Sequence, residues 1–266
     1  MGDTYTHGHH ESVLRSHSWR TIANSAAYLA PHLRADHRLL DVGCGPGTIT
    51  VEFAERLSAG RVVGIDYAPD IITKAAADPD AQARSNLEFR VGDVYDLDFA
   101  DDSFDIVHAH QVLQHVSEPV AALCEMRRVV KSDGIVAIRD ADYHAMSWYP
   151  LDPILDRWMD VYQGVARRND AEPDAGRRLL AWAREAGFTA PTPSASVWCF
   201  AETDSRSWWG SLWADRVVSS SLGEQAVAYG LSSENGMHEI ADAFRRWMAS
   251  DDAWFTIVNG EVLCRD

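Results

Sequence analysis

The chain has 266 residues, of which 46% are hydrophobic and 24% are charged. This composition fits a globular protein with a sizeable core and excludes a disordered or fibrous chain. The formal net charge of −16 disfavours nucleic acid and anionic membrane surfaces as partners, because like charges repel.

The cysteines and apolar runs bear on the compartment. Four widely spaced cysteines, without a C-x-x-C pair, indicate neither a zinc site nor a disulfide framework. We therefore expect a reducing, cytoplasmic location. No apolar run reaches about 18 residues and no secretory signal occurs, so membrane insertion is not expected. The N-terminal histidines lack a recognised ligand spacing, and no metal site is predicted.

Between residues 39 and 142, short apolar runs alternate with helical patterns, an order typical of a parallel sheet covered by helices. The runs are nearly all apolar, as expected for strands that are buried on both faces. Helices are expected to begin near Gly47, Pro69 and Ser117, with the Ser117 hydroxyl capping free amides. The predicted strands are residues 39–42, 61–66, 87–92, 104–109 and 134–139.

The pattern changes after residue 142. Residues 143–176 and 203–250 are predicted as inserted segments, the second forming a helical cover over the functional edge of the sheet. The prediction is an α/β fold with a doubly wound, mostly parallel sheet. Residues 36–142 would form its core, and residues 143–266 would complete it. A helix over 177–186 ending at Gly187, strands at 196–201 and 254–258, and a turn at Asn259-Gly260 into a last strand at 261–264 are also expected.

A glycine-rich turn lies between the first strand and the first helix of this core, in Asp41-Val42-Gly43-Cys44-Gly45-Pro46-Gly47-Thr48. Glycines let backbone amides approach a ligand closely. A dinucleotide fingerprint would need glycine or alanine in place of Thr48. The Asp41 carboxylate suits an ammonium group better than a diphosphate. Taken alone, the turn is also compatible with simple packing of a helix on a sheet.

Two more acids follow the next two strands. Asp66 ends the second strand, where an acid can accept hydrogen bonds from ribose hydroxyls. Asp93 ends the third, where a carboxylate can accept one from an adenine amino group. Since the carboxyl ends of parallel strands share one edge, Asp41, Asp66 and Asp93 are predicted to face one crevice. Singly, each is compatible with a helix-capping or turn role.

These motifs resemble those of the class I S-adenosylmethionine-dependent methyltransferases, especially the small-molecule branch that includes the ubiquinone and menaquinone biosynthesis enzymes. The likeness covers about residues 39–142 and rests on 41–47, Asp66, 92–94 and 104–110. It implies a seven-stranded Rossmann-like sheet, S-adenosylmethionine as cofactor and S-adenosylhomocysteine as product. Ser132-Asp133 departs from the family's usual proline and glycine.

The resemblance also implies how the cofactor site is divided. The 43–47 loop would hold the methionine portion, Asp66 the ribose, Asp93 and Val94 the adenine, and His110 a wall beside the sulfonium. An N-terminal helical lid over residues 1–35 is implied too, although a surface helix with a buried Trp19 is the alternative. The implied cofactor-binding residues are Asp41, Gly43, Cys44, Gly45, Gly47, Asp66, Tyr67, Gly92, Asp93, Val94 and His110, with Tyr5, Arg15 and Trp19 from the lid.

Methyl transfer mainly requires alignment of the acceptor with the methyl carbon and sulfur. A general base is needed only if the acceptor must lose a proton. Because histidine titrates near neutral pH, His115 and His144 are the candidate catalytic residues. Orientation of the adjoining loop and helix is the alternative role for His115.

The inserted segments are rich in tryptophan. Most of these side chains are expected in the core, and some are expected to line an acceptor pocket. This favours a small apolar or aromatic metabolite as acceptor, and leaves the methylated atom and a homodimer open. Two alternatives are a cofactor-binding protein that transfers no methyl group and, disfavoured by Asp41 and Thr48, a nicotinamide-dependent oxidoreductase. The tryptophans concerned are Trp148, Trp158, Trp208, Trp209 and Trp213.

Overall fold

The structure, a computed structural model, describes residues 16–266. Within them the chain forms a seven-stranded sheet in the order β3-β2-β1-β4-β5-β7-β6, and β7 runs antiparallel to both of its neighbours. This confirms the predicted α/β class with a mostly parallel sheet. The strands are β1 (Arg38–Val42), β2 (Arg61–Asp66), β3 (Leu87–Val91), β4 (Phe104–His110), β5 (Val130–Tyr149), β6 (Thr192–Phe200) and β7 (Trp254–Cys264).

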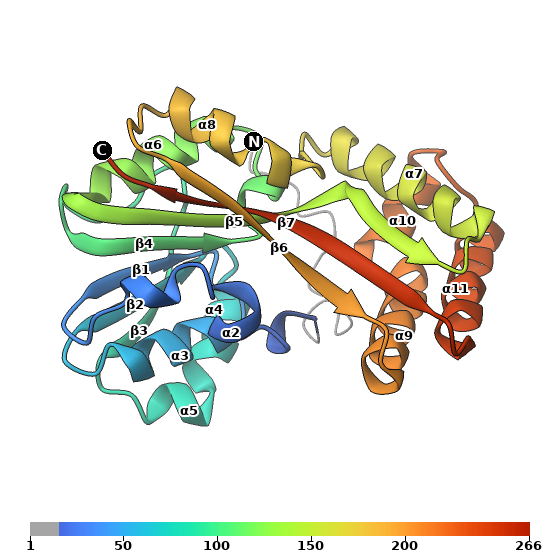
Figure 1. The fold of residues 1–266 in the computed structure, drawn as a ribbon, viewed down its shortest axis with the longest axis horizontal. Helices are drawn as coiled ribbons and strands as arrows, with labels where there is room; N and C mark the ends of the chain where they lie inside the picture. The colour runs from blue at the N-terminus through green and yellow to red at the C-terminus, as the bar shows by residue number, and fades with distance from the viewer. Residues whose placement is uncertain (1–15) are drawn as a thin grey trace.

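Helices pack on both faces of the sheet (Figure 1). Phe53 of α3 and Ile22 of α2 belong to the core on one face, whereas Leu123 of α6 and Leu179 of α8 belong to the core on the other. The helices of this part are α2 (Ile22–Ser25), α3 (Thr48–Arg56), α4 (Pro69–Ala77), α5 (Pro79–Gln82), α6 (Pro119–Val129) and α8 (Leu179–Glu185), with the 3-10 turns η1 (Ala30–His32), η2 (Leu113–His115) and η3 (Ala175–Arg177).

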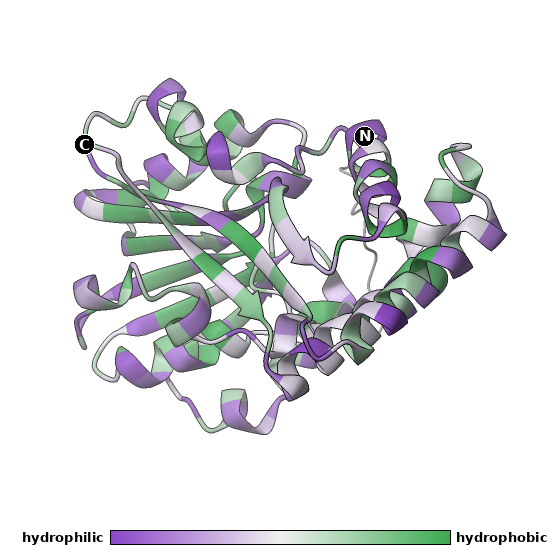
Figure 2. Cartoon of the chain, turned by 45° about the vertical axis from the view of Figure 1, so that its right-hand side comes forward, coloured by the Kyte–Doolittle hydropathy of each residue, from purple (hydrophilic) through white to green (hydrophobic). Residues whose placement is uncertain are grey.

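A second helical group packs where β5 and β7 extend beyond β4 (Figure 1). Its core is strongly aromatic and includes Trp158, Trp213, Phe244 and Phe255, all essentially inaccessible to solvent. The central strands are mostly hydrophobic, and the helices carry hydrophilic residues on their outer surfaces (Figure 2). The group consists of α7 (Pro153–Arg168), α9 (Thr203–Ser219), α10 (Ser221–Ala228) and α11 (Glu234–Ala249).

Two local predictions are wrong. Asn259-Gly260 is not a turn, because β7 continues through both residues and pairs with β5 and β6 along its length. A Cβ on Gly260 would lie 2.0 Å from the carbonyl oxygen of Gly176, so this glycine permits a close backbone approach instead. Ser117 does not cap α6: its N-cap is Glu118, whose amide donates to the Tyr95 hydroxyl.

Candidate functional site

The loop between β1 and α3 is shaped by its glycines. Gly43, Gly45 and Gly47 have φ angles of +64°, +55° and +85°, the left-handed region that favours glycine. A Cβ on Gly43 would lie 2.5 Å from Cγ2 of Val112, and one on Gly47 would lie 2.5 Å from Cζ of Phe89. Bare backbone at these positions is therefore a steric requirement, and it leaves the loop open on the side that faces a cavity.

This cavity, called here the glycine-loop cavity, has a volume of about 570 Å³. That volume lies within the range of small-molecule sites. Its walls come from the carboxyl ends of β1, β2, β3 and β4 and the turns that follow them, as predicted for an open α/β sheet. The predicted site residues that line it are Asp41, Gly43, Cys44, Gly45, Asp66, Tyr67, Gly92, Asp93, Val94, His110 and His115.

The three predicted acids do reach this cavity, yet each also binds the protein itself. Asp41 is buried, and its carboxylate accepts from Thr50 Oγ1 at 2.6 Å and pairs with His108 Nδ1 at 2.7 Å. Asp66 accepts from the amide of Gly45 at 3.0 Å. The other carboxylate oxygen of Asp66 accepts a hydrogen bond from a backbone amide of the turn after β2. The carboxylate of Asp93 likewise accepts a hydrogen bond from a backbone amide of the turn after β3. Asp66 and Asp93 thus fix the loops that form the cavity walls, whereas Asp41 ties β1 to α3 and β4.

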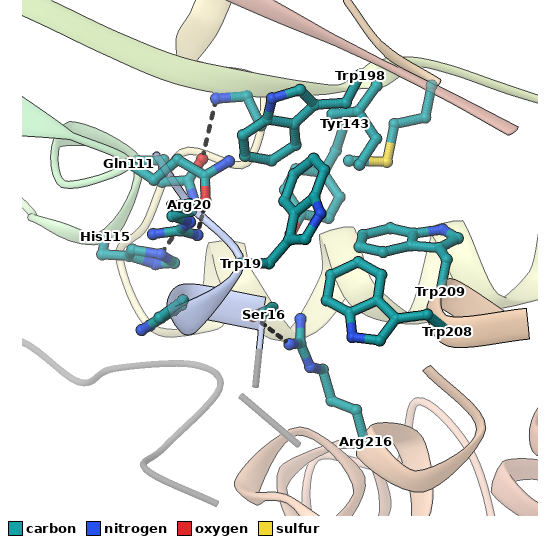
Figure 3. A pocket seen from close by; sticks show the side chains of 15 residues that line it. Ser16, Trp19, Arg20, Gln111, His115, Tyr143, Trp198, Trp208, Trp209 and Arg216 are labelled. Carbon is teal, nitrogen blue, oxygen red and sulfur yellow. Dashed lines mark hydrogen bonds between the residues drawn. The ribbon is translucent and has the colours of Figure 1, made fainter. Parts of the chain in front are cut away.

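A second, smaller cavity adjoins the first, and we call it the aromatic pocket (Figure 3). It has a volume of about 40 Å³, enough for only a few water molecules. Tryptophans from three separate segments form one side of it. Trp19 packs against Trp198, Phe200 and Trp208 with ring centroids 5.2 to 5.6 Å apart. The lining also includes Arg20, Gln111, Gln114, Tyr143, Met146, Trp209, Arg216 and Ile257.

The two cavities share the wall residues His17, Arg20, Gln111 and His115. Thr48 Oγ1 donates to the carbonyl of His17, and Arg20 donates to Oε1 of Gln111. The segment of residues 16–20 therefore lies across the junction and contacts both the glycine loop and the end of β4. Gln111 has φ +54°, a rare angle for a side-chain-bearing residue, which marks this junction as conformationally constrained.

Burial dominates the titration of the groups around this junction. It lowers the pKa of His115 to about 3, with further lowering by Arg20 and Arg216, so this imidazole is neutral at pH 7. Burial and Arg20 likewise hold the pKa of His110 well below its usual range. Beneath the turn η2, burial raises the pKa of Asp140 to about 7, while its Oδ1 accepts from the amide of Gln114.

Other predicted residues lie away from the glycine-loop cavity. Trp19 lines the aromatic pocket, and Gly47 serves as the N-cap of α3 without lining either cavity. His144 is exposed and lines neither cavity. Tyr5 and Arg15 lie outside the described residues. Of the five tryptophans that the sequence analysis named, Trp208 and Trp209 line the aromatic pocket, whereas Trp148, Trp158 and Trp213 pack in the core of the helical group.

Sequence reasoning did not single out Arg20, Gln111, Trp198 or Arg216. None belongs to a local motif, because the pocket unites segments that are distant in sequence. The available signal was the position of Gln111, two residues after the end of the fourth predicted strand. In the part of the chain described, no cluster of three or more His, Cys, Asp or Glu side chains is placed to hold a metal ion. No helix within residues 16–266 has the length and apolar character needed to span a membrane.

The strand order, the inserted antiparallel β7, the glycine loop after β1 and the acids after β2 and β3 together define the Rossmann-like methyltransferase class. Residues 33–187 match the family profile described as a methyltransferase domain. The chain belongs to this methyltransferase family, whose methyl donor is S-adenosylmethionine.

Known relatives agree with this membership. The chain is 35% identical to an uncharacterized methyltransferase of Schizosaccharomyces pombe over 97% of this chain and 95% of that protein. It is 30% identical to a demethylmenaquinone methyltransferase of Thermobifida fusca, over 70% of this chain and 78% of that enzyme. Among solved structures, the YcgJ protein of Bacillus subtilis has the same fold, with a TM-score of 0.57, 20% identity and coverage of 97% of this chain and 100% of that one.

Proposed function

We propose that S-adenosylmethionine binds in the glycine-loop cavity and that its methyl group is transferred in line to a small aromatic or apolar metabolite in the aromatic pocket. The observation that carries this proposal is the contact between the two cavities through His17, Arg20, Gln111 and His115. A ligand in each cavity would meet at this shared wall. Alignment of two reactants contributes about 7 to 11 kcal/mol in well-oriented intramolecular reactions.

The residues around the larger cavity fit the cofactor. The loop of residues 43–47 offers bare backbone to the methionine portion, and Cys44 lies within it. Asp66 and Tyr67 line the part proposed for the ribose, and Gly92, Asp93 and Val94 line the part proposed for the adenine. Asp41, just before the loop, is held in place by its hydrogen bonds with Thr50 and His108. Cationic sulfur and ammonium groups suit a cavity with three acids in its walls.

When bound, the cofactor supplies an electrophilic methyl carbon on a positively charged sulfur. The chain's own task is to hold the acceptor and exclude water. His115 is proposed to stand in the wall where the two ligands meet, and His110 in the wall of the glycine-loop cavity beside the sulfonium, both as neutral side chains. A base works best with a pKa near the working pH, so a pKa of about 3 makes His115 a poor proton acceptor. We infer an orienting role for His115 and no contact of the exposed His144 with the acceptor.

The segment of residues 16–20 supports the predicted N-terminal lid, because it covers the junction between the cavities. The four cysteines are free, which supports the predicted reducing, cytoplasmic compartment. Light scattering of the purified protein checks for a homodimer, which the sequence leaves open.

Two measurements test the proposed function. Calorimetry with S-adenosylhomocysteine should show binding that weakens roughly 10- to 100-fold in Asp66→Ala, because hydrogen bonds to charged groups are worth about 1.5 to 3 kcal/mol. Asp70→Ala, at an exposed position in the first turn of α4, is the matched control and should bind like the wild type.

The second measurement is release of S-adenosylhomocysteine from S-adenosylmethionine in the presence of a panel of small aromatic acceptors. Release that depends on one acceptor class supports a transferase. Tight cofactor binding without release for any acceptor would favour a binding protein, and selective binding of NADH would favour an oxidoreductase.

A further inference from the structure

The aromatic pocket differs in charge from the rest of the protein. The chain carries a net charge of −16, yet the described residues that line this pocket include Arg20 and Arg216 and no aspartate or glutamate. Four indole rings and the Tyr143 ring supply the remaining chemistry, together with two glutamines. The pocket therefore combines flat apolar surfaces with guanidinium groups, which recognise a different class of ligand from a purely apolar pocket.

Arg216 is held at the pocket wall by its surroundings. It comes from α9, is only 4% exposed, and its guanidinium carbon lies 4.7 Å from the centroid of the Trp213 ring. Its Nη2 donates to Ser16 Oγ at 2.8 Å. A guanidinium has five N–H donors in a fixed plane, the geometry that binds a carboxylate in a bidentate manner, and these contacts fix the orientation of that plane.

Arg20 approaches the same pocket from another element. It follows Trp19 in the N-terminal segment and donates to Gln111 at the end of β4. Figure 3 shows Arg20 and Arg216 on different sides of Trp19. Both arginines act on the same groups: after burial, they are the further causes that lower the pKa of His115, and both oppose the rise that burial causes in the pKa of Tyr143. Both guanidinium groups therefore act on the same part of the pocket.

We propose that the aromatic pocket binds a planar aromatic acid, with its ring against the tryptophans and its carboxylate at Arg216 and Arg20. This inference rests on the proposed function, since it names the substrate class of the same acceptor site. An anion in an otherwise acidic protein requires such a local cationic site, because elsewhere the field opposes its approach. Charge-assisted hydrogen bonds from a guanidinium to a carboxylate are about twice as strong as neutral ones.

The pocket must widen to admit a ring, because its volume is about 40 Å³, whereas a cavity that binds benzene has about 150 Å³. Trp19 is the wall residue to yield. It is 36% exposed, and it is held by ring contacts with Trp198, Phe200 and Trp208 rather than by the packed core of a helix. A ring that takes its place would keep the same aromatic contacts, and it would change the tryptophan fluorescence of the pocket.

Benzoate and benzamide form a matched pair of probes, because they differ in charge and scarcely in shape. Their dissociation constants are measured by tryptophan fluorescence at pH 7, with and without S-adenosylhomocysteine. We expect benzoate to bind at least tenfold more tightly than benzamide. Arg216→Gln should weaken benzoate at least tenfold and change benzamide less than twofold. Arg245→Gln, which removes an exposed guanidinium on α11, is the control and should change neither.

Equal affinity of the wild type for the two probes overturns the inference, as does an Arg216→Gln variant that weakens both to the same extent. Arg216 is buried, so folding of each variant is checked by circular dichroism. If Arg216→Gln does not fold, Arg20→Gln decides by the same criterion, because Arg20 is only partly buried. Calorimetry with S-adenosylhomocysteine separates the two proposals. If the wild type does not bind S-adenosylhomocysteine, the proposed function is refuted. If it binds S-adenosylhomocysteine but does not prefer benzoate to benzamide, only the proposal of an aromatic acid as ligand is refuted.

Discussion

The glycine-loop cavity and the aromatic pocket are neighbours that are built in opposite ways. The first is formed mostly by residues 41–121, and its shape depends on backbone angles at glycines and on carboxylates that accept backbone amides. The second unites side chains from the N-terminal segment, the turn after β4, β5, β6, α9 and β7, which are far apart in sequence. One region depends on local conformation, and the other depends on the tertiary packing of large rings.

The two ways of building a cavity differ in how many substitutions they tolerate. A cofactor site built on backbone geometry tolerates few substitutions, because a Cβ at the wrong place blocks the loop. A pocket built from side chains changes shape with each substitution and needs no change in the fold. The following variants should affect the two regions differently.

The largest expected effect is on the free energy of unfolding, through a buried arginine that packs against the aromatic pocket. Arg139 is completely buried, pairs with Glu261 at 3.2 Å and lies 4.5 Å from the centroid of the Trp198 ring. Arg139→Met should lower the free energy of unfolding by about 3 to 5 kcal/mol, because it leaves Glu261 buried without its partner. Urea denaturation measures this value. Arg245→Met, at the half-exposed Arg245–Asp242 pair, should cost less than about 1 kcal/mol; a similar loss in both variants would contradict the argument.

A second effect concerns the turn η2, which lines both regions. The pKa of Asp140 is raised from 3.8 to about 7, so the native carboxyl keeps its proton where the unfolded one has lost it. Stability due to this group is present below pH 4 and is lost as the pH rises to 7. Asp140→Asn should therefore gain stability relative to the wild type over this interval, on the order of 3 to 4 kcal/mol. Thermal denaturation at pH 4 and pH 8 checks it, and a difference that does not change with pH would exclude this titration.

A third effect isolates the glycine loop. Gly43→Ala should weaken S-adenosylhomocysteine binding roughly 10- to 100-fold, because a left-handed backbone costs a side chain about 1 to 3 kcal/mol and the Cβ would overlap Val112. Gly230 has φ +68° with open space around it, so Gly230→Ala carries the backbone cost alone. Calorimetry should show unchanged binding for Gly230→Ala. Equal weakening in both variants would mean that general destabilisation, and not the loop, controls affinity.

The smallest effect is expected at His115. His115→Gln should lower turnover less than about tenfold and leave the pH profile between pH 5 and 8 unchanged, because the pKa of about 3 lies outside that range. Initial rates across this range measure it. A fall of 100-fold or more, with loss of an ionisation near neutral pH, would restore His115 as a base.

The sequence predicted the fold and the glycine-loop cavity well, and the aromatic pocket poorly. Short buried strands and the acids at their ends follow from local patterns, so β1 to β4 and the places of Asp41, Asp66 and Asp93 could be predicted. The continuation of β5 to Tyr149 and of β7 through Gly260 depends on pairing between distant strands. Arg20 and Arg216 are 196 positions apart, and no local pattern brings them to one cavity.

The wall that both cavities share gives them a route for thermodynamic coupling. Because His17, Arg20, Gln111 and His115 line both cavities, a ligand that shifted this wall would change the affinity of the other cavity for its own ligand, and linkage would require the effect to be reciprocal. Trp208 and Trp209 face only the smaller cavity. If the two cavities hold cofactor and acceptor as proposed, substitutions at such outer positions would change acceptor preference at constant cofactor affinity, whereas substitutions in the shared wall would alter the binding of both.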